Sequence, residues 1–217
     1  MKEEQTGWID SSDLSSIRIL YVMAKVIIVL TNHGDLGKTG NKTGWYLPEV
    51  AHPYKVFKAA GWNVTFVSPK GGKAPMDPGS GEMFKEDKDC QEFLSNAGVM
   101  KEIENTKKPN YAVIFYAGGH GPMWDLADDK AAIYENNGIV GAVCHGTVGL
   151  CPVFLSNGSH ILKDKSETKL TDLGAKFIGV ADWQPNVQAD GRVITGQNPN
   201  SATPVAKKIV EDYMYIH

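Results

Sequence analysis

Residues 138–150 read GIVGAVCHGTVGL, and the rest of the chain can be arranged around this stretch. The apolar run at 139–143 is short and unbroken, which is typical of a parallel strand covered on both faces. Small residues follow Cys144, so a helix can begin directly against the sheet. The stretch therefore predicts a strand, a sharp turn that carries a cysteine, and a helix, which together form a nucleophile elbow.

The sequence allows two interpretations of Cys144. On an elbow its side chain projects from the carboxyl end of the sheet, where backbone N–H groups and a helix dipole push a thiol toward thiolate. Alternatively it is a small buried residue of the core, because free cysteine is among the most buried residue types. The polar His145 and the permissive Gly146 beside it favour the chemical interpretation.

Composition narrows the class of protein. The chain has 217 residues, of which 42% are hydrophobic, enough for one large α/β domain. Its net charge of -3, with Lys and Arg scattered, argues against nucleic acid or an anionic membrane as a partner. Three cysteines without a CxxC pair argue against a disulfide framework and a structural zinc site. The apolar residues 17–30 are interrupted by charges and too short to span a bilayer, so we expect a cytoplasmic protein.

The remaining pattern alternates strands and helices. We expect a loosely ordered N-terminal extension at residues 1–22 and a single domain over residues 23–217. A first helix should begin near Pro48, and a C-terminal amphipathic helix should follow Ser201. A hairpin with a type I′ turn is predicted at Asp190-Gly191. The predicted strands are residues 23–31, 63–68, 111–116, 138–143 and 175–180, with a surface loop at 69–81 and a weak helix at 127–136.

Polar groups gather at three predicted strand ends, where open parallel sheets place their reacting groups. They are Glu49 after the first strand, Gly118-Gly119-His120 after the third, and Cys144-His145 after the fourth. A cysteine that acts on a carbonyl needs a proton partner and an oxyanion site, and these ends can supply both. Each of these groups also has a plain structural interpretation. Glu49 is either that proton partner or an ordinary acid in the first turn of a helix, and the glycines form either an anion-binding turn or a plain tight turn. His145 is either a base or a hydrogen-bonded histidine beside the sheet.

Other reactive or aromatic residues have weaker patterns. Cys90 and Cys151 lie in helical stretches without an acid-base partner at a fixed spacing, so structural burial is the preferred interpretation. The histidines that lack the mutual spacing of a zinc site are His33, His52 and His160. The tryptophans that can wall a pocket, although aromatic residues more often lie in a core, are Trp45, Trp124 and Trp183.

Five stretches resemble the DJ-1/PfpI superfamily. They are residues 23–32, 42–53 (KTGWYLPEVAHP), 117–125 (AGGHGPMWD), 142–146 (AVCHG) and 190–199 (DGRVITGQNP). Within the superfamily they are most similar to the Hsp31-like branch of glutathione-independent glyoxalase III enzymes. The resemblance implies a flavodoxin-like α/β fold, in which a mostly parallel sheet with a cysteine nucleophile elbow is sandwiched between helices and the protein is commonly a homodimer.

The resemblance also implies an activity and the roles of several residues. Family members convert methylglyoxal, a small 2-oxoaldehyde, to D-lactate without a metal or organic cofactor. Cys144 would be the nucleophile, Glu49 the acid-base group that shares a proton with it, and His145 an aid to proton transfer. The oxyanion site would lie at Gly118-Gly119-His120, with the N–H groups of Gly119 and His145 as donors. We therefore expect a small-molecule substrate and no cofactor, metal, nucleic acid or membrane.

The chain departs from the family pattern after the elbow helix. The family supplies a third carboxylate there to orient the histidine, whereas residues 162–175 offer no matched position and Glu167 is the nearest acid. The segments before Tyr111, near residue 130 and near residue 165 are also short. An incomplete site with a reactive thiol motivates the alternative function, a non-enzymatic redox-sensing stress protein or holdase chaperone. An amidotransferase or peptidase ranks third, because no late His-x-Glu pair completes a triad.

Overall fold

The structure of this chain, a computed structural model, describes residues 24–106, 113–125, 138–151, 153, 159–161 and 178–216. The predicted extension at 1–22, the weak helix at 127–136 and the possible third acid Glu167 lie outside these residues. So does most of the strand predicted at 175–180, and its described part, residues 178–180, is not a strand.

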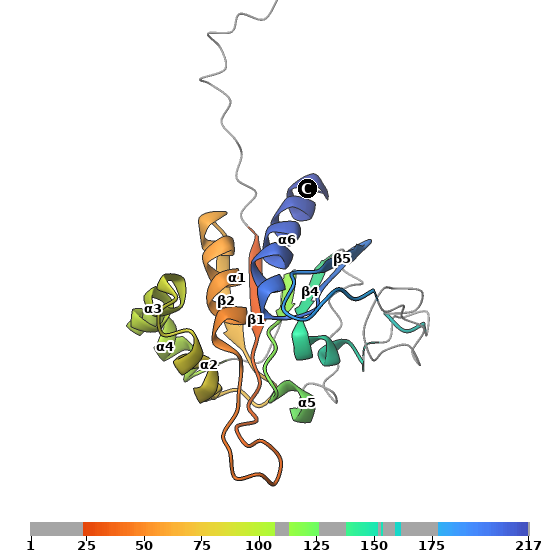
Figure 1. Cartoon of the computed structure of the whole chain (residues 1–217). Helices are drawn as coiled ribbons and strands as arrows, with labels where there is room; N and C mark the ends of the chain where they lie inside the picture. Colours follow the sequence, from red (N-terminus) through yellow and green to blue (C-terminus); the bar gives the residue numbers. More distant parts are fainter. Residues whose placement is uncertain are drawn as a thin grey trace, which may run out of the picture.

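In the described part of the chain, six strands form one sheet in the order β2-β1-β3-β4-β6-β5 (Figure 1). Every neighbouring pair is parallel except β5 and β6, which are antiparallel. The strands are β1 (Lys25–Val29), β2 (Asn63–Val67), β3 (Val113–Tyr116), β4 (Ile139–Val143), β5 (Val187–Asp190) and β6 (Val193–Gly196). This arrangement confirms the predicted flavodoxin-like α/β fold.

Helices cover the sheet and its carboxyl end. The long helices α1 (Leu47–Ala59) and α6 (Ala202–Ile216) lie side by side (Figure 1). The ring of Trp62, which follows α1, lies 5.0 Å from that of Tyr213 in α6. The shorter ones are α2 (Pro78–Met83), α3 (Lys88–Ser95), α4 (Ala97–Ile103), α5 (Pro122–Asp125) and the 3₁₀ helices η4 (Cys144–Leu150) and η6 (Pro199–Ser201). Among the described residues, no helix combines the length and apolar character needed to cross a bilayer.

The strands contribute to two cores, one on each face of the sheet. Ile28 and Phe115 belong to the core beneath α1 and α6, whereas the adjacent Ile27 and Ile114 belong to the core on the opposite face, together with Leu150 of η4. Successive side chains of a strand point to opposite faces, so a sheet that is buried on both needs apolar residues at every position. This explains the unbroken apolar runs in the sequence.

Two further local predictions were wrong. The predicted loop at 69–81 ends in helix α2, because the side chain of Asp77 caps it and accepts a hydrogen bond from the N–H of Ser80 at 3.0 Å. The hairpin turn is Gly191-Arg192, since Asp190 pairs with Val193. Only Gly191 has a positive φ there, of 59°, which is typical of a type II′ turn with glycine in its first central position.

Phe57 offers a test of the core beneath α1. Its ring is fully buried, stacked on Trp62 at 5.6 Å and edge-on to Phe115 at 6.0 Å. Phe57→Ala should lower the free energy of unfolding by about 3–5 kcal/mol, because it leaves a cavity lined by aromatic rings. Urea unfolding followed by circular dichroism measures this, with the exposed neighbour Lys58→Ala as control. A loss equal to that of the control would contradict the packing described.

Candidate active site

Cys144 lies at the predicted elbow. It follows the last residue of β4 and has a φ of 52°, and Trp183 is the other non-glycine residue of the described part with a positive φ. This conformation costs a residue with a Cβ on the order of 1–2 kcal/mol, and such strain is concentrated at functional sites. The helix that follows is a 3₁₀ helix, and Gly146 lets it approach β3: a Cβ there would lie 2.4 Å from the carbonyl oxygen of Tyr116.

Glu49 reaches the same place from the first turn of α1. Its side chain is fully buried, and Oε2 accepts a hydrogen bond from the backbone N–H of Gly118 at 2.7 Å. Two contacts fix the beginning of the helix: the N–H of Tyr46 donates to the carbonyl oxygen of Gly118 at 3.2 Å, and the N–H of Leu47 donates to the hydroxyl of Ser80 at 3.0 Å. Oε1 of Glu49 is buried without a hydrogen-bond partner among the described residues. The carboxyl group therefore has one oxygen held and one available.

Glu49 and Cys144 influence each other's ionisation. Burial raises the pKa of Glu49 to about 8, although the hydrogen bonds from Gly118 and Cys144 oppose the change. Burial and the negative charge of Glu49 likewise raise the pKa of Cys144. The prediction that the thiol of Cys144 is shifted toward thiolate is therefore wrong, because burial is the largest effect on its pKa and raises it. Because two neighbouring negative charges are unfavourable in a buried site, the pair keeps at least one proton.

Backbone donors surround the sulfur atom of Cys144. The N–H groups of His145 and Gly119 form hydrogen bonds that lower the pKa of the thiol, against the larger effects of burial and Glu49. They are therefore placed to stabilise negative charge at this point. The turn needs glycine at both positions. A Cβ on Gly118 would lie 2.3 Å from Oε2 of Glu49. Gly119 has a φ of +103°, and a Cβ on it would lie 2.2 Å from the carbonyl oxygen of Gly44.

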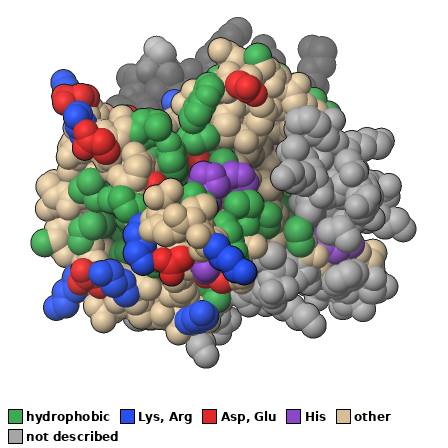
Figure 2. Space-filling model, turned by 60° about the horizontal axis from the view of Figure 1, so that its bottom comes forward, with side chains coloured by type: hydrophobic (Ala, Val, Ile, Leu, Met, Phe, Trp, Pro, Cys, Tyr) green, Lys and Arg blue, Asp and Glu red, His purple; other side chains and the backbone are tan. Residues whose placement is uncertain are grey.

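The two histidines of the predicted site lie beside the cysteine. Nδ1 of His145 is 3.7 Å from Sγ of Cys144, and the ring of His145 lies 5.1 Å from that of His120. The side chain of His120 is exposed. Figure 2, which brings the lower end of Figure 1 forward, shows histidine side chains at the centre of this face among hydrophobic ones. The structure thus brings together all the predicted site residues, namely Glu49, Gly118, Gly119, His120, Cys144 and His145.

A cavity of about 260 Å³ opens at Cys144. Its other lining residues are Asp182, Trp183, Gln197, Asn198 and Pro199. Trp183 is held there in its strained conformation, because Nδ2 of Asn200 donates to its carbonyl oxygen at 2.5 Å. The sequence indicated Trp183 as a possible pocket wall. It did not indicate Gln197 and Asn198, although both lie in the stretch at 190–199 that resembles the family. The other two tryptophans do not line this cavity: Trp45 is buried in the core, and Trp124 stacks on His33.

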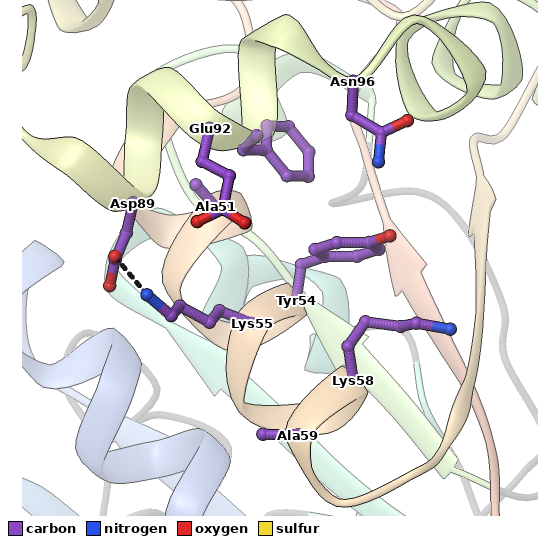
Figure 3. A pocket seen from close by; sticks show the side chains of 9 residues that line it. Ala51, Tyr54, Lys55, Lys58, Ala59, Asp89, Glu92 and Asn96 are labelled. Atoms are coloured by element: carbon purple, nitrogen blue, oxygen red, sulfur yellow. Dashed lines mark hydrogen bonds and ion pairs between the residues drawn. The ribbon is translucent and has the colours of Figure 1, made fainter.

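A larger cavity of about 340 Å³ lies between α1 and α3 (Figure 3). It is lined by Tyr54, by Lys58 and by Lys55, which is paired with Asp89. None of the predicted site residues contributes to it, so the smaller cavity is the one associated with the cysteine.

The chain is similar in sequence to one family of known proteins and to its curated members. Residues 44–212 match the DJ-1/PfpI family. Glyoxalase 3 of Candida albicans is 28% identical over 87% of this chain and 98% of its own length. The glutathione-independent glyoxalase HSP31 of Saccharomyces cerevisiae is 29% identical over 86% of this chain and 97% of its own length.

Solved structures agree with these sequence matches. The crystal structure of glyoxalase III from Candida albicans superposes with a TM-score of 0.76 and 25% identity, over 87% of this chain and 97% of that one. The Rapid Encystment Protein 24 kDa of Francisella tularensis has a TM-score of 0.77 and 34% identity, over 87% of this chain and 98% of that one.

The raised pKa of Glu49 makes a prediction about stability. Between about pH 4.5 and about pH 8 the folded chain keeps a proton on Glu49 that the unfolded chain loses, so the free energy of unfolding falls as pH rises through this range. Glu49→Gln removes the effect. The melting temperature of the variant relative to the unmodified chain should therefore increase from about pH 5 to about pH 8.5. Glu82→Gln, which alters an exposed side chain, is the control. A difference in melting temperature between the Glu49→Gln variant and the unmodified chain that stays constant with pH would contradict the burial of an acidic group at this position.

Proposed function

The chain belongs to the DJ-1/PfpI family, and we propose that it is a glutathione-independent glyoxalase. Its substrates would be methylglyoxal and other small 2-oxoaldehydes, and its products D-lactate and the corresponding 2-hydroxy acids. Relatives that match nearly their whole length are named for this activity. The observation that carries the proposal is the buried carboxyl of Glu49 beside the strained Cys144, because the reaction needs a nucleophile and a group that moves a proton.

The reaction would begin with attack of the Cys144 sulfur on the aldehyde carbon. A carbon–sulfur bond forms, the thiol proton passes to the new alkoxide oxygen directly or through Glu49, and the product is a hemithioacetal. The N–H groups of Gly119 and His145, which already form hydrogen bonds to the thiol, support the oxyanion role proposed for them. Gly118 would contribute by fixing Glu49, and His120 would help to bind the substrate. His145, whose Nδ1 lies 3.7 Å from the sulfur, would assist proton transfer.

Glu49 would then move a proton between the two carbon atoms. As a carboxylate it removes the proton from the former aldehyde carbon to give an enediol, and as an acid it returns a proton to the neighbouring carbon. The aldehyde carbon is thereby oxidised and the ketone carbon reduced within one molecule, so no external oxidant is needed. The product is a thioester on Cys144, which water hydrolyses to release the hydroxy acid. A pKa of about 8 suits both tasks, because either form is accessible near neutral pH.

The surroundings support a small substrate. The cavity at Cys144 has a volume of about 260 Å³, with the indole of Trp183 and the polar side chains of Gln197 and Asn198 in its wall. An apolar wall with a few polar groups is suited to a methyl ketone that also carries an aldehyde.

We further propose the context in which the enzyme works. A match over 87% of this chain includes 98% of the length of a relative, which supports a single domain over residues 23–217. The family resemblance supports a cytoplasmic homodimer, and the net charge of -3 supports the absence of nucleic-acid and membrane partners. Light scattering of the purified chain measures the oligomeric state, and a mass of one chain would reject the dimer.

Substitutions of the two central residues test the activity. Cys144→Ala should reduce D-lactate formation from methylglyoxal to the background rate, because no nucleophile remains. Glu49→Gln should reduce kcat/KM by roughly 10²–10⁴-fold through loss of acid-base catalysis. Cys151→Ser is the matched control and should keep most of the activity. Undiminished turnover in either central variant would reject the mechanism, and absence of turnover in the unmodified chain would favour the redox-sensing or holdase alternative.

Trp183→Ala tests the assignment of the cavity. Removing the indole wall should raise KM for methylglyoxal by about 10-fold and change kcat much less, because the side chain binds substrate without taking part in proton transfer. Trp124→Ala, which alters an exposed indole outside the cavity, is the control. An unchanged KM would place the substrate elsewhere.

A further inference from the structure

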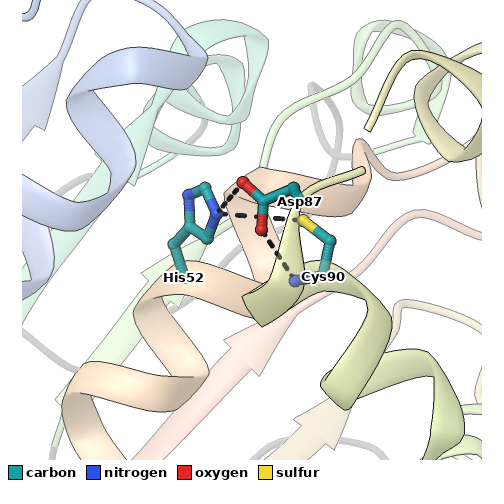
Figure 4. Close-up of side chains that lie close together, drawn as sticks. All are labelled: His52, Asp87 and Cys90. Atoms are coloured by element: carbon teal, nitrogen blue, oxygen red, sulfur yellow. Dashed lines mark hydrogen bonds and ion pairs between the residues drawn. The ribbon is translucent and has the colours of Figure 1, made fainter. Parts of the chain in front are cut away.

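A second cluster of reactive side chains lies apart from the proposed active site. His52 of α1 meets Asp87 and Cys90 at the beginning of α3 (Figure 4). Nε2 of His52 is 3.1 Å from Oδ2 of Asp87 and 3.8 Å from Sγ of Cys90, and the three ligand atoms all lie within 4.8 Å of one another. A nitrogen, an oxygen and a sulfur atom of metal-binding types therefore converge on one point.

The local fold holds the three side chains in this arrangement. Asp87 caps α3, and its Oδ1 accepts a hydrogen bond from the N–H of Cys90 at 2.9 Å. The cap leaves Oδ2 directed toward His52 and brings the thiol of Cys90 to the same side. His52 lies on α1, three residues after Glu49. The cluster is thus prearranged by elements that the fold already needs.

Two of the three ligand separations resemble those of a tetrahedral zinc site. Ordinary Zn–N and Zn–O bonds of about 2.0–2.1 Å and Zn–S bonds of about 2.3 Å give ligand separations of roughly 3.3 Å for N···O and 3.6 Å for N···S. The observed separations of 3.1 Å and 3.8 Å differ from these by a few tenths of an ångström. A magnesium or calcium ion would fit poorly, because both prefer oxygen ligands and avoid thiolate.

Burial also suits three protein ligands and one open position. The thiol of Cys90 is fully buried, whereas the side chains of His52 and Asp87 keep 21% and 29% of their surface exposed. An ion can therefore enter from the side of His52 and Asp87 and keep a water molecule as its fourth ligand. The two negative charges of Asp87 and a Cys90 thiolate balance a divalent ion.

We propose that His52, Asp87 and Cys90 form a site for a thiophilic divalent metal ion, zinc being the best match, which joins α3 to α1. On binding, the sulfur–hydrogen bond of Cys90 breaks, its proton goes to solvent, and a sulfur–metal bond forms. The sequence did not indicate this site, because His52 and Cys90 are 38 residues apart and lack the short spacing of common zinc motifs. The proposal is independent of glyoxalase activity, since none of the three residues belongs to the proposed active site.

Cobalt titration tests the proposal directly. The chain with Cys144→Ala, which removes the thiol of the proposed active site, should bind one Co²⁺ with a thiolate–metal charge-transfer band and the intense visible bands of tetrahedral cobalt. Zn²⁺ should displace it. Cys90→Ser in the same background should abolish the charge-transfer band, and Cys151→Ser should leave it intact. His52→Ala and Asp87→Asn, which keeps the helix cap, should each weaken binding by at least about 10-fold.

Thermal unfolding gives a second readout that does not depend on cobalt. Zn²⁺ should raise the melting temperature of the chain with Cys144→Ala, and Asp87→Asn should remove most of the increase even if Cys90→Ser proves too unstable to purify. Absence of a charge-transfer band, a band that survives Cys90→Ser, or an equal zinc effect in the Asp87→Asn variant would each overturn the proposal. The cluster would then be a hydrogen-bonded link between α1 and α3.

Discussion

The hydrogen bond from the N–H of Gly118 to the buried carboxyl of Glu49 is the constraint on which the site depends. It joins the beginning of α1 to the end of β3, and the return bond from Tyr46 to the carbonyl oxygen of Gly118 fixes the same two segments. Because a Cβ on Gly118 would overlap Oε2 of Glu49, only glycine allows this approach. The elbow at the end of β4 then brings Cys144 to the acid.

This arrangement lowers the stability of the fold but makes Glu49 and Cys144 reactive. An acidic group without full hydrogen bonding is unfavourable in a core, and a cysteine at a φ of 52° adds backbone strain. The apolar cores on both faces of the sheet are large enough to hold these groups in place. In return, burial gives Glu49 a pKa of about 8, so that it can hold or release a proton near neutral pH. A solvated carboxyl with an ordinary pKa would be almost fully ionised.

The sequence predicted much of the fold and the central residues of the site. The unbroken apolar runs indicated β1, β3 and β4 because both faces of the sheet are buried, and small residues after Cys144 indicated the elbow. Other features depend on contacts that spacing does not reveal. The direction of the pKa change at Cys144 follows from its burial beside Glu49, 95 residues earlier in the numbering of the chain. The cavity wall from Trp183 to Pro199 and the meeting of His52 with Cys90 likewise arise only when separate segments pack together.

The central claim is that Glu49, buried beside Cys144, keeps its proton at neutral pH. Infrared difference spectroscopy between the unmodified chain and the Glu49→Gln variant tests it most directly, because a protonated carboxylic acid has a carbonyl stretch well separated from the bands of a carboxylate. At about pH 6.5 we expect the band of a protonated, buried acid, which should disappear as the pH passes about 8. A spectrum that shows only ionised Glu49 at about pH 6.5 would contradict the claim.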